Sequence, residues 1–365
     1  MPFRPSRRQL LTGSLAGLTL PSQARARRLR VGFVNPGRTT DGFWQMADRL
    51  MRTAADHFDI DLVVRRGERD RQRIIVQGRE LIDQGLDYLA IVNEHRTAVP
   101  LANAAMEAGT PCLLVFSGLA ADDIAILGRP RERSPLLLGS LVADNMAAGA
   151  AMARGLLSEC RRLRRPERTD AVPLLAIAGP AATPAGQERS DGLRLAVAAD
   201  GNAVVLDHVS LNWSREQARS RVISLLRRQP QTEGIWCAND DMALGALDGA
   251  AELGFKTGID LALVGMNWQT DALREVAAGR IALSMGGHFL LGAWALAWLR
   301  DHADGRDFAA AGGAEQRLSL APLDRQGADR YLARFGDDGW SRIDFSRLRQ
   351  RRGAYDLQVT SVLAV

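Results

Sequence analysis

Residues 29–64 read LRVGFVNPGRTTDGFWQMADRLMRTAADHFDIDLVV, and this stretch decides the fold class. Two short apolar runs, 29–34 and 60–64, flank a longer amphipathic stretch that predicts a helix from about Phe43 to His57. Continuous apolar strands that alternate with helices are typical of a parallel sheet covered on both faces. The stretch therefore predicts a β–α–β unit.

The same alternation continues along the chain and restarts once, after the arginine-rich stretch 161–170. Before the restart, the pattern predicts helices at about 71–84 and 99–108 and strands at 87–92 and 111–116. After it, the pattern predicts strands at 172–179, 203–209, 233–238 and 260–266, with helices at 186–199, 214–228 and 241–253. Two such units in series predict an α/β protein in which two doubly wound parallel-sheet lobes are joined by a multi-strand hinge.

We expect the chain to divide into an export signal and two lobes. The predicted segments are 1–26 for the export signal, 27–143 plus 285–316 for the N-terminal lobe, and 144–284 plus 317–365 for the C-terminal lobe with a C-terminal extension. The hinge is expected near 142–145, 283–286 and 316–322. The extension beyond Pro322 has two interpretations, a packing cover for the second lobe or a segment that docks on a membrane sensor.

The first 26 residues have the order of an export signal. Arg4, Arg7 and Arg8 precede an apolar run from residue 10 to 20, and Ala24-Arg25-Ala26 follows as a cleavage motif. Spanning a bilayer takes about 20 apolar residues, so a run of ~11 favours cleavage over retention as an anchor. The arginine pair fits a twin-arginine signal or an ordinary one. We therefore expect a protein exported to the periplasm.

Charge and composition argue against several functional classes. Losing the four arginines of the signal lowers the formal charge from +5 to +1, so the whole-chain pI of 9.7 does not indicate nucleic-acid binding. Three widely spaced cysteines, Cys112, Cys160 and Cys237, predict neither a disulfide framework nor a zinc knuckle. The five histidines are scattered, and no phosphate loop, nucleophile elbow or paired catalytic carboxylate stands out. We expect no enzymatic activity, cofactor or metal.

The residues that follow the predicted strands form the candidate binding site. In open parallel sheets, ligands lie beyond the carboxyl ends of the strands. The segments at those ends are 35–44, 93–96, 116–117, 187–190, 212–213, 239–240, 266–268 and 286–288. They are rich in amides, aromatic rings and arginine, and they lack a nucleophile–base pair. This composition indicates binding rather than catalysis.

Several of these segments also carry a family resemblance. GQERSDGLRLAV (186–197), IWCANDDMALGALDGAAELG (235–254) and LALVGMNWQTDALREVAAGRIALSM (261–285) resemble type I periplasmic sugar-binding proteins, the ribose-binding and autoinducer-2-receptor group. The resemblance runs over about residues 29–300. Sugar-responsive repressors share this fold, but they carry a helix-turn-helix where this chain has the export signal.

The resemblance implies a solute-binding protein of periplasmic binding protein type I. Such a protein captures a small polar ligand, a sugar or sugar derivative, by hinge closure and delivers it to an ABC permease. The alternative is the ligand-binding subunit of a membrane sensor kinase or chemoreceptor, without transport. We expect a monomer whose partners are a small molecule and a membrane protein, and no nucleic acid.

The resemblance assigns ligand contacts residue by residue, and the strand ends add others. The ten candidates are Asn35, Phe43, Trp44, Asn93, Glu94, Phe116, Arg189, Trp213, Asn239 and Asn267. Aromatic rings stack on the apolar faces of sugars, and a guanidinium suits vicinal hydroxyls or a carboxylate. The alternatives are core packing for the two aromatic residues at 43–44, a surface position for the arginine, and a capping or exposed role for the glutamate. Asp240 is expected to cap the following helix.

The chain departs from the ribose binders at several anchor positions. Phe116 and Ser117 stand where those proteins have an aspartate and an arginine, and Asn267 stands where an aspartate is usual. Gly287, beside His288, falls near a glutamine position. Each lost charge-assisted hydrogen bond would cost about 1.5–3 kcal/mol. We therefore expect a ligand that differs chemically from ribose.

Overall fold

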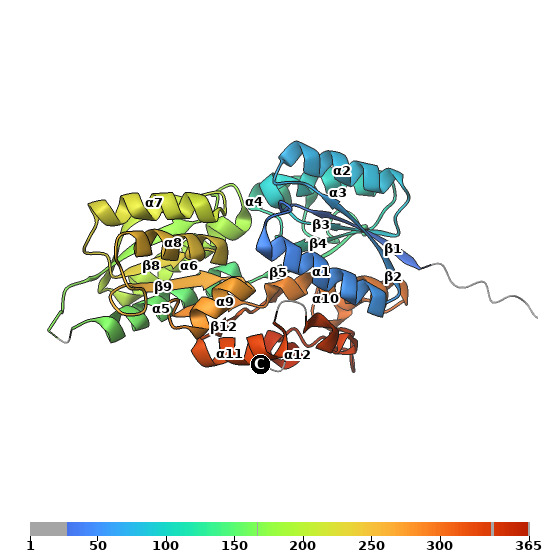
Figure 1. Ribbon diagram of the computed structural model, residues 1–365. Coiled ribbons are helices and arrows are strands. Elements are labelled where there is room, and N and C mark those ends of the chain that lie inside the picture. Colours follow the sequence, from blue (N-terminus) through green and yellow to red (C-terminus); the bar gives the residue numbers. More distant parts are fainter. Residues whose placement is uncertain (1–27, 166, 337–338, 364–365) are drawn as a thin grey trace, which may run out of the picture.

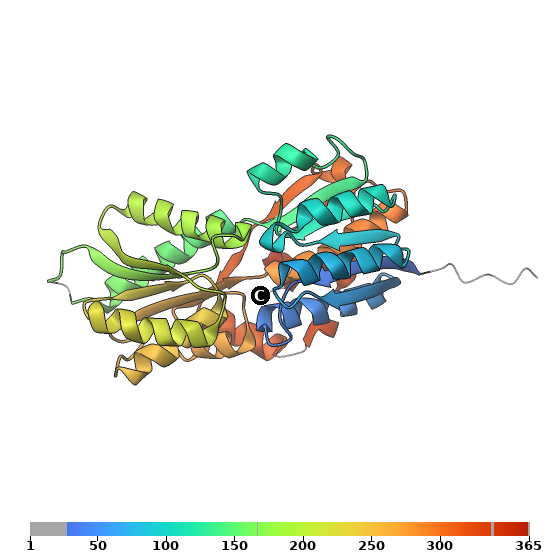
Figure 2. The same ribbon diagram turned by 90° about the horizontal axis from the view of Figure 1, so that it is seen from above.

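The computed structural model describes residues 28–165, 167–336 and 339–363, so the predicted export signal lies outside the described residues. The chain forms two lobes, each a six-stranded sheet flanked by helices (Figure 1). Seen from above, the lobes lie side by side and are joined near the middle of the molecule (Figure 2). The predicted fold class is confirmed.

Each sheet is dominated by parallel pairs. In spatial order the first sheet contains β11 (Glu315–Leu318), β5 (Leu137–Ala143), β4 (Cys112–Phe116), β3 (Tyr88–Ile91), β1 (Leu29–Asn35) and β2 (Ile60–Arg66). The second contains β12 (Ala321–Leu323), β10 (Leu283–Gly286), β9 (Ala262–Met266), β8 (Gly234–Cys237), β6 (Val172–Ala178) and β7 (Ala203–Ser210). Only β12 runs antiparallel to its neighbour among the described strand pairs. The carboxyl ends of the parallel strands therefore gather at one edge of each sheet.

Helices cover the sheets in both lobes. The first lobe has α1 (Gly42–His57), α2 (Arg71–Asp83), α3 (Ala98–Glu107), α4 (Ala121–Leu127) and α10 (Leu291–Ala303), with 3-10 turns η1 (Glu94–Arg96), η2 (His288–Leu290) and η3 (Phe308–Ala311). The second lobe has α5 (Asn145–Leu163), α6 (Pro184–Asp200), α7 (Arg215–Arg228), α8 (Asp240–Glu252), α9 (Thr270–Ala277) and α11 (Arg325–Arg334). In the described part of the chain, no helix is long and apolar enough to cross a membrane.

Polar side chains fix several helix starts. Asp70 accepts the backbone N–H of Arg73 at 2.6 Å at the start of α2, and Asn239 accepts the N–H of Met242 at 2.9 Å at the start of α8. The expectation that Asp240 caps α8 is therefore wrong. Asn239 has the extended backbone that an N-cap requires, whereas Asp240 is already the first residue of the helix.

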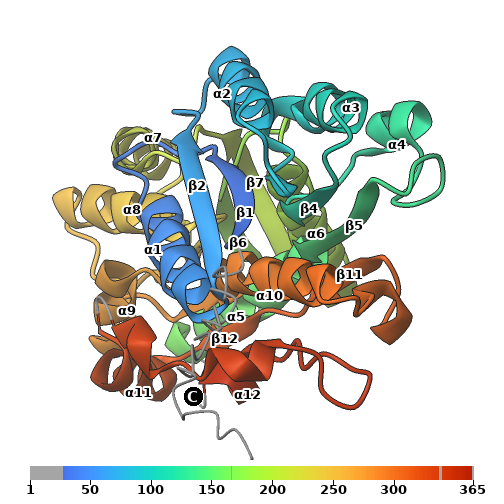
Figure 3. The same cartoon turned by 90° about the vertical axis from the view of Figure 1, so that its right-hand side faces the viewer.

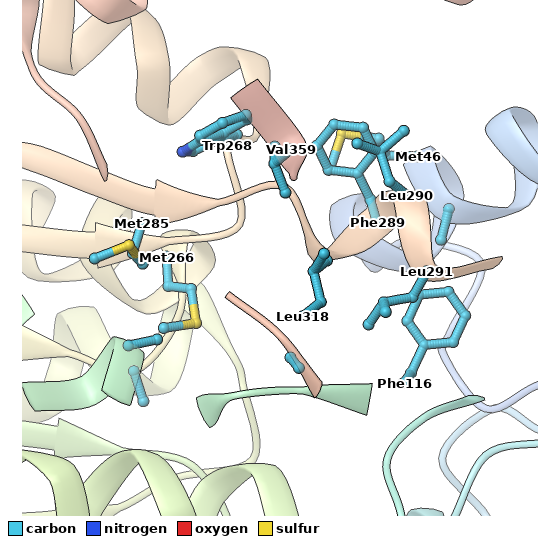
Figure 4. Packing of buried hydrophobic residues seen from close by; sticks show 14 of the residues in the cluster. Met46, Phe116, Met266, Trp268, Met285, Phe289, Leu290, Leu291, Leu318 and Val359 are labelled. Carbon is cyan, nitrogen blue, oxygen red and sulfur yellow. The ribbon is translucent and has the colours of Figure 1, made fainter. Parts of the chain in front are cut away.

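The chain crosses between the lobes at three places, all at or beside the segments where the sequence predicts the hinge. The crossings run from β5 into α5, from β10 into η2, and from β11 to β12. Gly287 lies in the second crossing with a φ of 97°, and a Cβ there would lie 2.3 Å from the side chain of Val359. Figure 4 shows Val359 next to this crossing, which continues into Phe289 and Leu290.

The C-terminal extension contacts both lobes, which departs from its predicted place in the C-terminal lobe. On the second lobe, α11 packs on α9, and the rings of Tyr331 and Trp268 are 5.4 Å apart. On the first lobe, Arg349 and Tyr355 donate to the buried carboxylate of Asp301 at 2.7 and 2.9 Å.

The elements of the extension are η4 (Gly339–Arg342), η5 (Phe345–Leu348) and α12 (Val359–Leu363), after α11. Figures 1 and 3 both place α11 and α12 below α1 and α10. The aromatic side chain of Phe345 lies 6.4 Å from that of Phe58, which directly follows α1. The extension reaches the first lobe because its apolar side chains are buried against this part of the lobe.

Candidate ligand-binding cleft

A cavity lies between the lobes, where the strands of both sheets end. It encloses about 620 Å³ of atom-free space, its opening to solvent included. Both lobes and the second crossing contribute to its lining, which consists of Asp41, Phe43, Trp44, Arg69, Val92, Glu94, Phe116, Ser117, Ala143, Ala185, Arg189, Trp213, Asn239, Asp241, Asn267 and His288.

Eight of the ten predicted residues line this cavity, and Asn35 and Asn93 do not. The amide of Asn35 donates to the backbone oxygen of Trp44 at 3.0 Å and accepts from the N–H of Gly37 at 2.9 Å. The amide of Asn93 donates to Asp123 at 2.8 Å and accepts from the backbone at the start of α3. Both amides are fully buried, and their hydrogen bonds stabilise the loops that contain them. These two residues position the cavity wall rather than form it.

Aromatic side chains face the cavity from both lobes. On the first lobe, the rings of Phe43 and Trp44 pack edge-on against Phe116, with centroids 6.0 and 5.2 Å away. Phe43 also stacks on His288 at 4.6 Å. On the second lobe, Trp213 lies under the guanidinium of Arg189 at 5.6 Å. Core packing and cavity lining therefore coexist at 43–44, and the rings offer apolar faces to a bound ligand.

Arg189 is a buried arginine of α6 and not the surface residue that the sequence allowed as an alternative. Its Nε donates to Asn145 at 2.9 Å, and its Nη1 donates to the backbone oxygen of Ala238 at 2.8 Å. Among the described residues, no carboxylate forms an ion pair with it, and burial lowers the pKa of its guanidinium to about 10. A ligand oxygen that accepts a hydrogen bond from this guanidinium would therefore form a stronger, charge-assisted bond.

Arg69 lines the cavity and was missing from the sequence prediction. Its Nε donates to Asp41 at 2.7 Å and its Nη1 donates to Glu94 at 3.2 Å. Burial raises the pKa of Glu94 above its usual range, and the charge of Arg69 acts in the opposite direction. Arg69 follows β2, so applying the strand-end rule to that strand would have found it.

Asp241 and His288 add further polar groups. Asp241 accepts from the side chain of Gln269 at 3.0 Å, and burial raises the pKa of its carboxyl. His288 is buried, and burial together with the charge of Arg189 keeps its pKa well below 6.5, so the imidazole is neutral near pH 7. Its Nδ1 has no hydrogen-bond partner within the described ranges.

The backbone around the cavity is strained. Four lining residues have φ in the left-handed region, namely Arg69 at 56°, Phe116 at 67°, Trp213 at 57° and Asn267 at 140°. This conformation is uncommon for residues other than glycine and costs on the order of 1–3 kcal/mol each. Such strain clusters at binding sites, where it holds side chains in place before the ligand arrives.

A cavity between two α/β lobes that three chain crossings connect is the arrangement typical of two-lobed ligand-binding proteins. The model of a family described as "Periplasmic binding protein domain" matches residues 31–307. The chain belongs to this family, which confirms the resemblance seen in the sequence.

Individual relatives agree with this assignment. A periplasmic sugar-binding protein from Pseudomonas fluorescens has 35% identity and a TM-score of 0.82, and the match covers 92% of this chain and 99% of that one. The galactofuranose-binding protein YtfQ of Escherichia coli is 22% identical over 76% of this chain and 83% of its own length. The xylitol-binding protein of Mycolicibacterium smegmatis is 27% identical over 63% of this chain, and the match spans only 59% of that protein.

Proposed function

We propose that this chain is an exported, periplasmic sugar-binding protein that captures a neutral sugar or polyol by hinge closure and passes it unchanged to an ABC permease. The observation that carries the proposal is the cavity lining. The aromatic rings of Phe43 and Trp213 lie on different lobes, and the same lining contains the fixed donors of Arg189 and the carboxyl oxygens of Asp241. This combination suits a ring with apolar faces and peripheral hydroxyls.

The distribution of the lining residues over both lobes supports hinge closure. Neither lobe encloses the site alone, because the first supplies the aromatic cluster and the second supplies Arg189, Asn239 and Asn267. A ligand held by one lobe gains its remaining contacts only when the other lobe closes on it, so binding favours the closed form. The relatives named above are described as binding xylitol, galactofuranose or sugars in general, which supports this ligand class.

The test is calorimetric titration of residues 27–365 with xylitol, D-ribose, D-allose, D-galactose and L-arabinose. At least one should bind saturably. Arg189→Met should weaken that binding by about 10- to 150-fold, because a hydrogen bond to a charged group contributes about 1.5–3 kcal/mol.

A matched control is available in the same lobe. The side chain of Arg164 is only 7% exposed, pairs with Glu233 and does not line the cavity. Arg164→Met should leave the affinity within about twofold of the parent protein, apart from any change in stability. Binding by none of the five compounds, or equal losses in the two variants, would refute the proposed site.

A further inference from the structure

A second hollow, the flank pocket, adjoins the ligand cavity on the side of β11 and α4. It encloses about 870 Å³ of atom-free space, its opening included, and shares Phe116 and Ser117 with the cavity. We propose that the flank pocket is a second subsite, which holds a further sugar unit linked to the one in the cavity. This inference rests on the proposed function and extends it from monosaccharides to glycosides.

In two segments, the first crossing and the start of α6, some residues line the cavity and their neighbours in sequence line the flank pocket. At the first crossing, Ala143 lines the cavity, whereas Val142 and Asn145 line the flank pocket. The first turns of α6 repeat this arrangement. Ala185 and Arg189 line the cavity, and residues 184 and 188, next to them in sequence, line the flank pocket. The two hollows therefore adjoin each other, with Phe116 and Ser117 common to both linings.

Hydrogen bonds connect the polar groups of the two hollows. Asn145 accepts from Nε of Arg189 at 2.9 Å and donates to Glu188 at 3.2 Å. Glu188 in turn accepts from Arg317 at 3.3 Å. Asn145 thus stands at the boundary, with one partner that lines the cavity and another that lines the flank pocket. A ligand that spans the boundary would meet a continuous row of donors and acceptors.

The charge of the flank pocket favours a neutral, hydroxyl-bearing group. Its two arginines are each paired, Arg317 with Glu188 at 3.3 Å and Arg129 with Glu315 at 2.9 Å. An anionic substituent would compete with these carboxylates for the arginines. A hydroxyl can donate a hydrogen bond to a carboxylate and accept one from a guanidinium group. Apolar side chains, among them Leu119, complete the lining and offer contact to the face of a sugar ring.

The experiment titrates three monosaccharides, D-galactose, D-glucose and D-xylose, beside lactose, melibiose, maltose, cellobiose and xylobiose, which carry the same sugars at their non-reducing ends. We expect at least one disaccharide to bind 10-fold or more tightly than its parent monosaccharide. Leu119→Trp should fill the flank pocket, weaken that disaccharide at least 10-fold and change the affinity for the monosaccharide by less than twofold.

The control adds the same indole nearby but outside the pocket. Ile126 is 58% exposed on α4 and does not line the flank pocket, so Ile126→Trp should change neither affinity. The unchanged monosaccharide affinity also shows that the Leu119→Trp protein is folded. Weaker binding of every disaccharide than of its parent sugar, or a disaccharide affinity that Leu119→Trp leaves intact, overturns the subsite and leaves the proposed function standing. Binding by none of these sugars, and by none of the five compounds that test the proposed function, overturns both.

Discussion

Replacing Asp240 by asparagine tests the contribution of its buried carboxyl group to the stability of the second lobe. The carboxylate of Asp240 is fully buried, accepts the N–H of Gln269 at 2.9 Å and accepts the hydroxyl of Ser284 at 2.8 Å. It therefore ties α8 to β10 and to the loop after β9 that presents Asn267 to the cavity. Burial is the largest influence on its pKa and raises it from 3.8 to about 7.

The size of the effect follows from proton linkage. Because the folded-state pKa is higher than the unfolded one, the folded protein keeps a proton between pH 3.8 and about 7 that the unfolded chain has lost. The free energy of unfolding therefore falls as pH rises through this window, by about 1.4 kcal/mol per unit and roughly 4 kcal/mol in total. An asparagine at 240 keeps the shape and has no proton to lose.

Urea unfolding of Asp240→Asn and the parent protein, at pH 5 and pH 8, measures this difference. The free energy of unfolding of the variant, relative to that of the parent protein, should be about 3 kcal/mol higher at pH 8 than at pH 5. Asp122→Asn is the control, because the side chain of Asp122 is 79% exposed and its pair with Arg96 lies at the surface. That variant should stay within about 1 kcal/mol of the parent protein at both values. A constant offset for Asp240→Asn across the two pH values would refute the reasoning.

The other predictions concern the extension and the buried histidine. Tyr355→Phe removes one of the hydrogen bonds to the buried carboxylate of Asp301 and should lower the free energy of unfolding by about 1–3 kcal/mol in urea titrations; no loss would show that the extension is not anchored there. His288 has a lowered pKa, so the unfolded chain takes up a proton below pH 6.5 that the folded protein does not, and stability falls as pH drops. In His288→Gln the free energy of unfolding should fall less than in the parent protein between pH 7.5 and pH 5, and an equal fall in the two proteins would contradict the prediction.

The sequence predicts the lobes well because buried parallel strands leave an unmistakable apolar pattern. The same pattern brings Phe116, Trp213 and Asn267 to the cavity, since residues after parallel strands must meet at one edge of the sheet. The sequence prediction lacks Arg69, which follows the mostly half-buried strand β2, and it lacks β5, although residues 137–143 form a fully buried strand.

The role of a residue within a loop is harder to predict from the sequence than its position at the edge of the sheet. An amide at a strand end can face the ligand or hold the loop, and Asn35 does the second because Gly37 and Trp44 offer it backbone partners. The extension shows a similar limit. Its apolar residues indicate burial, but only three-dimensional packing decides that Phe345 meets the first lobe while α11 stays on the second.

Ligand-dependent closure of the cleft is the central claim, and the distance between the lobes tests it most directly. The three native cysteines are buried, so spin labels attach selectively to Val76→Cys on α2 and Ser220→Cys on α7, two exposed positions on opposite lobes (Figure 1). Pulsed electron spin resonance then measures the distance distribution with and without a sugar that binds. A shift to a shorter and narrower distribution at saturation is predicted, whereas identical distributions would contradict closure.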